Sequence, residues 1–140
     1  MSKVAVVFWS GTGNTQAMAD AVAAGAQAGG AEVTTFGPAE FGPDKVAEFD
    51  AIAFGCPAMG AEVLEESEFD PMFMAVEGAL SGKKIALFGS YGWGDGQWMR
   101  DWEERCASAG AVLATDSVMA NNAPDEDALA ECDSLGRALA

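Results

Sequence analysis

The chain has 140 residues, half of them hydrophobic, which is enough for one compact domain with a buried core. Its 22 acidic and seven basic residues give a formal net charge of −15, so nucleic acids and anionic membrane surfaces are disfavoured as partners. No apolar run is long enough to span a membrane and no secretion signal is recognisable at the start, so we expect a cytoplasmic protein.

Apolar, β-branched runs alternate with helix-favouring stretches along the chain. Strands are predicted over residues 4–8, 31–36, 51–55, 84–89 and 112–118. Helices are predicted to about residue 28, after the loop at 38–44, over 67–78 and 97–109, and after Pro124. This alternation predicts an α/β fold, with a parallel sheet and helices on both faces. The loops after the first, third and fourth strands should then converge on one ligand site.

The first of these loops, residues 10–15, reads Ser-Gly-Thr-Gly-Asn-Thr. Its glycines let backbone N–H groups point inward, its hydroxyls add donors, and the helix behind it contributes positive potential. It has no Lys for a nucleoside triphosphate, and Gln16 stands where a dinucleotide fingerprint needs glycine. The loop therefore suits a monophosphate held by neutral donors. A ligand-free turn capped by Ser10 or Asn14 is the alternative.

The second loop, residues 55–62, holds Met59 among small residues. Met59 could cover the face of an aromatic ligand or fold back into the core, and Gly60 could form a simple turn or a peptide that flips. The third loop, residues 90–96, places Tyr91 and Trp93 among glycines, which suits stacking on a flat ring. Two further tryptophans, at positions 98 and 102, are four residues apart on the next helix and are expected to pack in the core.

Two other groups of residues have less specific patterns. The cysteines at positions 56, 106 and 132 are widely spaced and are interpreted as ordinary reduced thiols. Acidic residues are concentrated at Glu62, Glu65, Glu66, Glu68 and Asp70. This acidic run is either a solvated surface or a docking surface for a basic partner, and its position beside the predicted ligand site favours docking.

Taken together, the three loops resemble those of the short-chain flavodoxins of anaerobic, clostridial-type bacteria. The phosphate loop of that family follows [ST]-x-T-G-x-T, as residues 10–15 do. Residues 56–60 and 88–94 are also close to sequence motifs of the family. The similarity runs from end to end, without the insertion in the fifth strand that long-chain members carry. The resemblance implies one domain, residues 1–140, with a flavodoxin-like doubly wound five-stranded parallel sheet of order 2-1-3-4-5 and helices on both faces.

The resemblance also implies FMN as a noncovalent cofactor and assigns its site. Ser10, Thr12, Asn14 and Thr15 would hold the phosphate with the N–H groups of Gly11 and Gly13, and Met59 and Trp93 would flank the isoalloxazine ring. Glu62 would accept the N–H of the pyrimidine ring, and Gly60 would supply a mobile carbonyl. Ser90, Gly92 and Asn122 would lie near the ring edges, although the Asn121–Asn122 pair leaves the choice of asparagine open. Pro57, Ala58, Tyr91 and Gly94 complete the expected site.

The function implied is low-potential one-electron transfer, with FMN cycling between semiquinone and hydroquinone. Its partners would be basic redox proteins, such as ferredoxin- or flavodoxin-type oxidoreductases, and the carrier is expected to be a monomer and not an enzyme. An FMN-dependent, quinone-type reductase on the same fold is the alternative. A receiver domain is disfavoured, because Gly55 and Cys56 stand where it needs a phosphorylatable aspartate.

Overall fold

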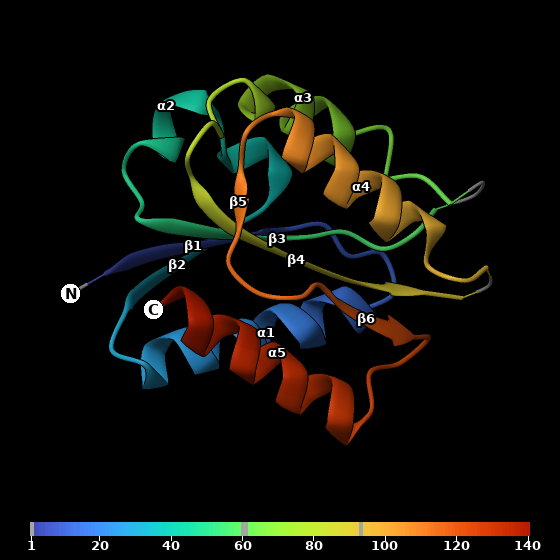
Figure 1. Ribbon diagram of the computed structural model, residues 1–140. Helices are drawn as coiled ribbons and strands as arrows, with labels where there is room; N and C mark the ends of the chain where they lie inside the picture. Colours follow the sequence, from blue (N-terminus) through green and yellow to red (C-terminus); the bar gives the residue numbers. More distant parts are fainter. Residues whose placement is uncertain (1, 60–61, 93) are drawn as a thin grey trace.

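The computed structural model describes residues 2–59, 62–92 and 94–140. One twisted sheet lies between two layers of helices (Figure 1). Its strands are β1 (Lys3–Phe8), β2 (Glu32–Phe36), β3 (Ala51–Gly55), β4 (Lys84–Tyr91), β5 (Val112–Leu113) and β6 (Val118–Asn121). The helices are α1 (Asn14–Ala28), α2 (Pro43–Val46), α3 (Phe69–Glu77), α4 (Gln97–Ser108) and α5 (Glu126–Leu139), with a 3₁₀ turn, η1, at Pro38–Glu40.

The strand order, β2-β1-β3-β4-β5, confirms the predicted topology. Every strand pair in this sheet is parallel, and β3 is buried along its whole length. The order reverses direction between β1 and β3, since the chain moves outward to β2 and then returns across β1. In open α/β sheets such a switch point leaves a crevice at the carboxyl ends of the strands, where ligands bind.

The prediction of one continuous fifth strand over residues 112–118 was wrong. β5 pairs with Lys84 and Ile85 at the start of β4, and β6 pairs with residues 88–91 at its end. The intervening sequence, Ala-Thr-Asp-Ser, is mostly polar and leaves the sheet, and the Ser117 hydroxyl donates a 2.6 Å hydrogen bond to Glu103 on α4. Polar side chains are poorly suited to a strand covered on both faces.

Three other boundaries differ from the prediction. β4 extends to Tyr91, two residues beyond the predicted end, because Ser90 and Tyr91 pair with β6. The predicted loop over residues 38–44 contains η1 and the start of α2. Helix α3 begins at Phe69, two residues later than predicted, and Pro71 lies in its first turn, where its missing N–H costs no hydrogen bond.

Each face of the sheet carries its own core (Figure 1). Helices α2, α3 and α4 cover a core rich in aromatic residues, and Trp98 and Trp102 are buried in it, as predicted. On the other face, α1 and α5 cover smaller side chains and approach closely. Both Gly25 of α1 and Gly136 of α5 face backbone of the opposite helix, where a Cβ atom would lie about 2 Å from a carbonyl oxygen.

The three cysteines are buried and form no disulfide bond, in agreement with their interpretation as ordinary thiols. Burial raises the pKa of each thiol to about 12, so none is a thiolate at neutral pH. Within the described part of the chain, no helix combines the length and apolar character that crossing a bilayer requires.

Candidate functional site

A cleft of about 220 Å³ lies at the carboxyl ends of β1, β3 and β4. The three loops singled out in the sequence all contribute to its wall. Its described lining residues are Trp9, Gly11, Thr12, Asn14, Pro57, Ala58, Met59, Ser90, Tyr91, Gly92 and Asn122. Ten of these eleven residues were predicted to bind a cofactor. The parallel sheet thus brings predicted site residues together although some are more than 100 positions apart in the sequence.

The first loop turns from β1 into α1 at Gly13, which has a φ of 93°. This left-handed conformation strongly favours glycine. The Ser10 hydroxyl accepts hydrogen bonds from the N–H groups of Gly13 (3.1 Å) and Gln16 (3.2 Å). Ser10 therefore caps the helix, as the ligand-free alternative proposed, and yet Gly11, Thr12 and Asn14 line the cleft.

Thr15 and Ser90 connect the first loop to the end of β4 beneath the cleft. Both side chains are buried, and their hydroxyl oxygens lie 3.5 Å apart. Ser90 lines the cleft, whereas Thr15 is not among the lining residues and sits in the first turn of α1. This contact joins the first turn of α1 to the end of β4.

The second loop forms a small antiparallel hairpin. Met59 and Val63 exchange two backbone hydrogen bonds, of 2.8 and 3.1 Å, and the N–H of Ala58 donates to the carbonyl of Ser90 at 3.0 Å. Met59 is half-buried in the wall of the cleft and does not belong to the core. Gly60 and Ala61 lie outside the described residues, so the mobile carbonyl of Gly60 remains a prediction.

Glu62 does not line the cleft. Its φ is 56°, and its carboxylate accepts a 3.2 Å hydrogen bond from the N–H of Gln97 at the start of α4. A Cβ atom on Gly94, which has a φ of 92°, would collide with this carboxylate. Glu62 therefore connects the second and third loops. Its assignment as an acceptor for the flavin remains a prediction.

The third loop begins at Gly92, after the end of β4. Tyr91 lines the cleft and packs at a tilt against Trp98, with ring centroids 5.5 Å apart. Trp93 lies outside the described residues, so its predicted stacking remains a prediction. Of the two adjacent asparagines, Asn122 lines the cleft, with a φ of 58° and an N–H donated to the Tyr91 carbonyl at 2.7 Å.

Trp9 is the cleft residue that sequence reasoning missed. It follows β1 directly, its ring packs over Gly11, and a Cβ atom on that glycine would lie 2.9 Å from the indole. Its N–H donates to the carbonyl of Gly55 at 3.1 Å, which extends the pairing of β1 with β3. The position of Trp9, between a buried strand and a phosphate-type loop, is the sequence signal that could have identified it.

The acidic run was interpreted as a solvated surface or a docking surface, with docking favoured, and the burial of Glu65 contradicts this interpretation for that residue. Glu62 receives the N–H of Gln97, as described above. Glu65 is buried, and its carboxylate accepts hydrogen bonds at the start of α3. Asp70 pairs with Arg105 of α4 at 2.7 Å. Glu66 and Glu68 are exposed to solvent, and Glu62 and Asp70 are partly exposed.

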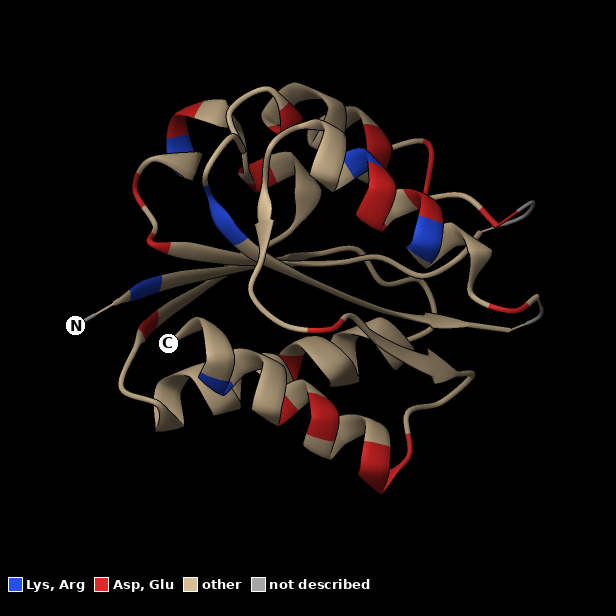
Figure 2. Ribbon diagram, in the orientation of Figure 1, with Lys and Arg blue, Asp and Glu red and all other residues tan. Residues whose placement is uncertain are grey.

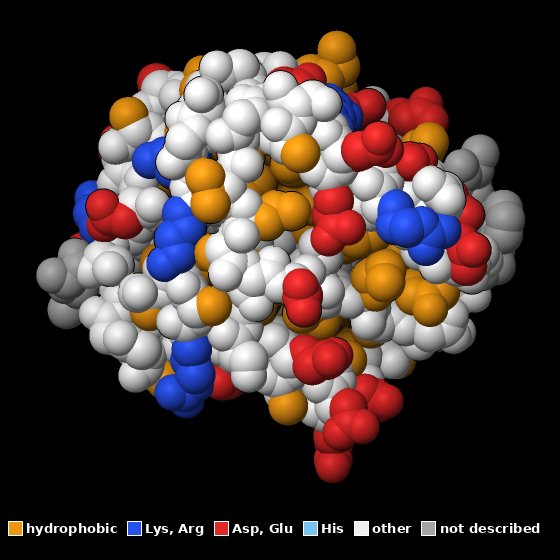
Figure 3. Space-filling view, in the orientation of Figure 1, with side chains coloured by type: hydrophobic (Ala, Val, Ile, Leu, Met, Phe, Trp, Pro, Cys, Tyr) orange, Lys and Arg blue, Asp and Glu red, His pale blue; other side chains and the backbone are white. Residues whose placement is uncertain are grey.

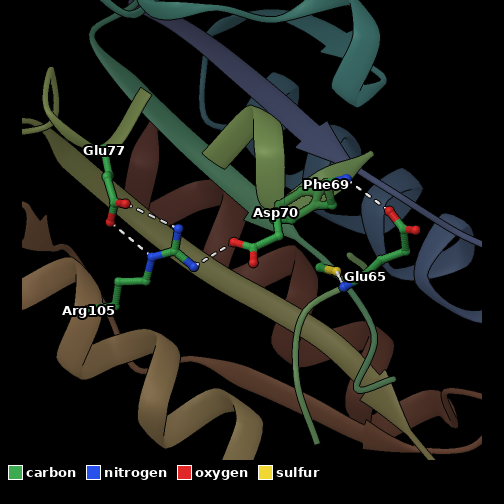
Figure 4. A network of polar contacts seen from close by, with 6 residues as sticks. Glu65, Phe69, Asp70, Glu77 and Arg105 are labelled. Carbon is green, nitrogen blue, oxygen red and sulfur yellow. Dashed lines mark hydrogen bonds and ion pairs between the residues drawn. The ribbon is translucent and has the colours of Figure 1, made fainter. Parts of the chain in front are cut away.

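Arg105 joins α3 to α4 beneath the second loop (Figure 4). Its guanidinium binds Asp70 on one side and both carboxylate oxygens of Glu77 on the other, at 2.9 and 3.1 Å. It also lies 4.9 Å from the ring centroid of Phe73. Burial lowers the pKa of Arg105, but the bonds to Glu77 and Asp70 outweigh it and raise the pKa above its ordinary value. This network joins α3, which follows the second loop in the chain, to α4, which follows the third loop.

The fold and the cleft define a doubly wound α/β protein that binds its ligand at the switch point of the sheet. Residues 6–135 match the family model described as Flavodoxin. The chain is 47% identical to a flavodoxin of Clostridium beijerinckii, over 96% of this chain and 97% of that protein. A flavodoxin of Megasphaera elsdenii is 45% identical over 98% of both chains. The solution structure of the two-electron reduced M. elsdenii flavodoxin superposes with a TM-score of 0.90, covering 97% of each chain.

The chain belongs to the flavodoxin family. Flavodoxins are electron carriers that bind FMN and exchange electrons with redox partners, so the chain is an electron-transfer protein and not an enzyme. This confirms the expected function and cofactor, and the alternative of a quinone-type reductase is not favoured.

The residues of the cleft fit FMN. At one end, the first loop and the start of α1 offer backbone N–H groups and the side chains of Thr12 and Asn14 to a phosphate. At the other end, Pro57, Ala58, Met59 and Tyr91 offer apolar and aromatic surface to a flat ring. The described lining includes neither Lys nor Arg, so uncharged donors would hold the phosphate.

Proposed function

We propose that the cleft holds FMN with its phosphate on residues 10–15 and its ring between the second and third loops. Backbone N–H groups, Thr12 and Asn14 bind the phosphate, while Met59 covers one face of the ring and Trp93 the other. Asn122, Ser90 and Gly92 lie along the ring edges. The observation that carries this proposal is the convergence of the three loops on one cleft at the switch point of the sheet.

FMN, when bound, supplies a ring that accepts and releases single electrons. The chain supplies an environment that opposes extra negative charge on this ring. The formal charge of −15 produces a negative field, and the apolar side chains beside the ring exclude water that would solvate an anion. Both effects favour a low reduction potential. We therefore infer that the protein delivers strongly reducing electrons.

Titration of the apoprotein with FMN tests this arrangement. We expect one FMN per chain, with strong quenching of flavin fluorescence because the ring stacks against aromatic side chains. The midpoint potential for full reduction of the bound FMN should lie below that of free FMN. Failure to bind FMN at micromolar concentrations, or a potential raised by binding, would refute the proposal.

We infer further that the redox partners are basic proteins that approach the cleft end of the molecule. Three of the four lysines, Lys3, Lys83 and Lys84, lie at the amino-terminal ends of strands, opposite the cleft. The exposed acids Glu66 and Glu68 lie between the second loop and α3. Figure 2 shows most basic segments at the end away from the loops, and in Figure 3 acidic side chains gather over α4, the β5–β6 connection and α5.

Such a charge distribution orients the molecule so that its flavin end meets a positive surface, which accelerates encounter. Electron transfer to a basic protein should therefore slow steeply as salt is added, because the Debye length falls to about 8 Å at physiological ionic strength. A rate that is independent of salt would contradict a steered encounter.

We also propose that residues 1–140 form a single monomeric domain that acts in the cytoplasm. The described strands form one sheet with a core on each face, which supports one folding unit. Sedimentation equilibrium of the FMN-loaded protein should give a mass near the 14.4 kDa of one chain. A mass near twice this value would refute the monomer.

A further inference from the structure

The second loop is closed at its base by a contact between Cys56 and Glu65. The N–H of Glu65 donates to the Cys56 sulfur at 3.3 Å. Between these residues lies the Met59–Val63 hairpin, which carries Met59 into the cleft wall. Cys56 is itself fixed to the sheet, because its N–H donates to the Phe88 carbonyl at 3.1 Å and its carbonyl accepts from the Trp98 indole at 3.1 Å. The start of the loop is therefore held by the core.

The end of the loop is held by the side chain of Glu65. This carboxylate is buried, and both of its oxygens are used. One accepts the N–H groups of Glu68 (2.8 Å) and Phe69 (2.9 Å), and the other accepts both the N–H (2.9 Å) and the hydroxyl of Ser67. Figure 4 shows the carboxylate turned back toward Phe69 at the start of α3. Glu65 thus joins the loop to the helix.

We propose that Glu65 is a positioning residue for the flavin site, which fixes the Met59–Val63 hairpin against the cleft by anchoring its end to α3. This inference rests on the proposed function, because the hairpin is assigned to the ring of FMN. Glu65 acts at a distance, since it is not among the residues that line the cleft. The oxygens of its carboxylate accept hydrogen bonds from residues 67–69, at the start of α3.

Substitution Glu65→Gln provides a direct test. The amide keeps the shape of the side chain, but its NH₂ group must face N–H or O–H donors, so part of the anchor is lost. The matched control is Glu66→Gln, which removes the same charge from the adjacent, exposed residue. Any effect of net charge on the flavin is common to both variants. The difference between them isolates the hydrogen bonds of Glu65.

We expect three results for Glu65→Gln that Glu66→Gln does not show. In the apoprotein, the backbone amides of residues 58–65 should exchange with deuterium faster, relative to the amides of α5. FMN should bind about tenfold more weakly, as expected for the loss of one net hydrogen bond to a charged group. The midpoint potential of bound FMN should also shift away from that of the control. Ser67→Ala, which removes one donor only, should change all three in the same direction and to a smaller extent.

The outcomes separate this inference from the proposed function. If wild type and Glu66→Gln bind FMN, the site assignment holds whatever Glu65→Gln does. If Glu65→Gln and Ser67→Ala then match the control in loop exchange, FMN affinity and potential, Glu65 merely stabilises α3 and the positioning role is refuted. If Glu65→Gln does not fold, Ser67→Ala decides by the same three measurements.

Discussion

Two hydroxyl groups of the first loop already have partners inside the protein. Ser10 accepts N–H groups at the start of α1, and the Thr15 hydroxyl lies against Ser90 beneath the cleft. Thr12, by contrast, is exposed and lines the cleft. Since Ser10 and Thr15 do not line the cleft, Thr12 is the hydroxyl residue of the loop best placed to donate to a phosphate.

Thr12→Val should selectively weaken binding of the phosphate. A hydrogen bond to a charged group contributes about 1.5–3 kcal/mol, so the Kd for FMN should rise by roughly ten- to a hundredfold. Riboflavin lacks the phosphate and serves as the control ligand, and its Kd should not change. Isothermal titration of both ligands measures the difference. Equal weakening for riboflavin would show that Thr12 acts on the ring or on the fold.

Glu65 makes the stability of the protein sensitive to acid. Burial raises the pKa of its carboxyl, but hydrogen bonds from the Ser67 side chain and from the N–H groups of Phe69, Ser67 and Glu68 outweigh it and lower the pKa from 4.5 to about 2. The folded state thus favours the ionised form. This stabilisation is complete above pH 4.5 and is lost as the pH falls from 4.5 to about 2.

The free energy of unfolding of Glu65→Gln should therefore fall less steeply with acid than that of wild type over this window. At neutral pH the variant should be less stable by about 1–2 kcal/mol, the usual cost of losing a helix cap. Urea unfolding at a series of pH values measures both effects. Glu66→Gln should keep the wild-type slope, and a parallel slope for Glu65→Gln would contradict the lowered pKa.

At this scale the residue types of the site were predictable, but their orientations were not. Glycine-rich spacing and strand-end position predicted which three loops form the cleft, and the family resemblance assigned ten of its described lining residues but not Trp9. Nothing in the sequence distinguishes Glu65, which is buried at a helix start, from the exposed Glu66 beside it. That distinction depends on the hydrogen bonds that the Glu65 carboxylate accepts from residues 67–69 at the start of α3.

At the scale of elements, the contact between α1 and α5 depends on two glycines. A Cβ atom on Gly136 would lie 2.0 Å from the Val22 carbonyl oxygen, and one on Gly25 would lie 2.1 Å from the Asp133 carbonyl oxygen. Both neighbours are backbone atoms that cannot rotate away. The helices can approach this closely only because these side chains are absent.

Gly136→Ala should therefore destabilise the protein, although alanine is the better helix former by about 1 kcal/mol. Overpacking typically costs about 1–3 kcal/mol, and rigid backbone neighbours place this site at the upper end. The control is Gly78→Ala at the end of α3, where φ is −67° and a Cβ meets nothing within 4 Å. This variant should equal or exceed wild type in stability. Thermal unfolding compares them, and a neutral Gly136→Ala would show that the helices can separate.

The order of elements followed from the alternation of apolar runs and helix-favouring stretches, since parallel strands joined by right-handed crossovers allow few arrangements. The break between β5 and β6 could not be predicted from this alternation. The segment 112–118 contains enough apolar residues to suggest one strand, but the polar residues 115–117 prefer solvent and the contact of Ser117 with Glu103. Such tertiary contacts overrule a local pattern and are invisible without the neighbouring helix.

At the scale of the whole molecule, the net charge of −15 was read directly from the sequence, but its distribution was not. The acidic run suggested a concentrated docking patch, whereas internal contacts employ Glu62, Glu65 and Asp70. The asymmetry arises instead from the lysines, three of which lie at the amino-terminal ends of strands, although exposed acids such as Glu32 lie at that end too (Figure 2). A partner would then respond to the field at the cleft end more than to any single carboxylate.

Two charge reversals distinguish position from net charge. Glu68 is exposed beside the second loop, and Glu32 is exposed at the start of β2, at the opposite end of the sheet. Glu68→Lys and Glu32→Lys therefore change the total charge equally. With a basic cytochrome c as acceptor, electron transfer from the reduced, FMN-loaded protein should slow by about threefold or more for Glu68→Lys at low salt.

Glu32→Lys should stay close to wild type in the same stopped-flow measurement, because its charge lies far from the approaching surface. The difference between the two variants should vanish at about 1 M salt, where the Debye length is about 3 Å. Equal slowing by both substitutions would mean that the partner responds only to net charge. Encounter would then have no preferred end, and basic partners would not be steered to the flavin.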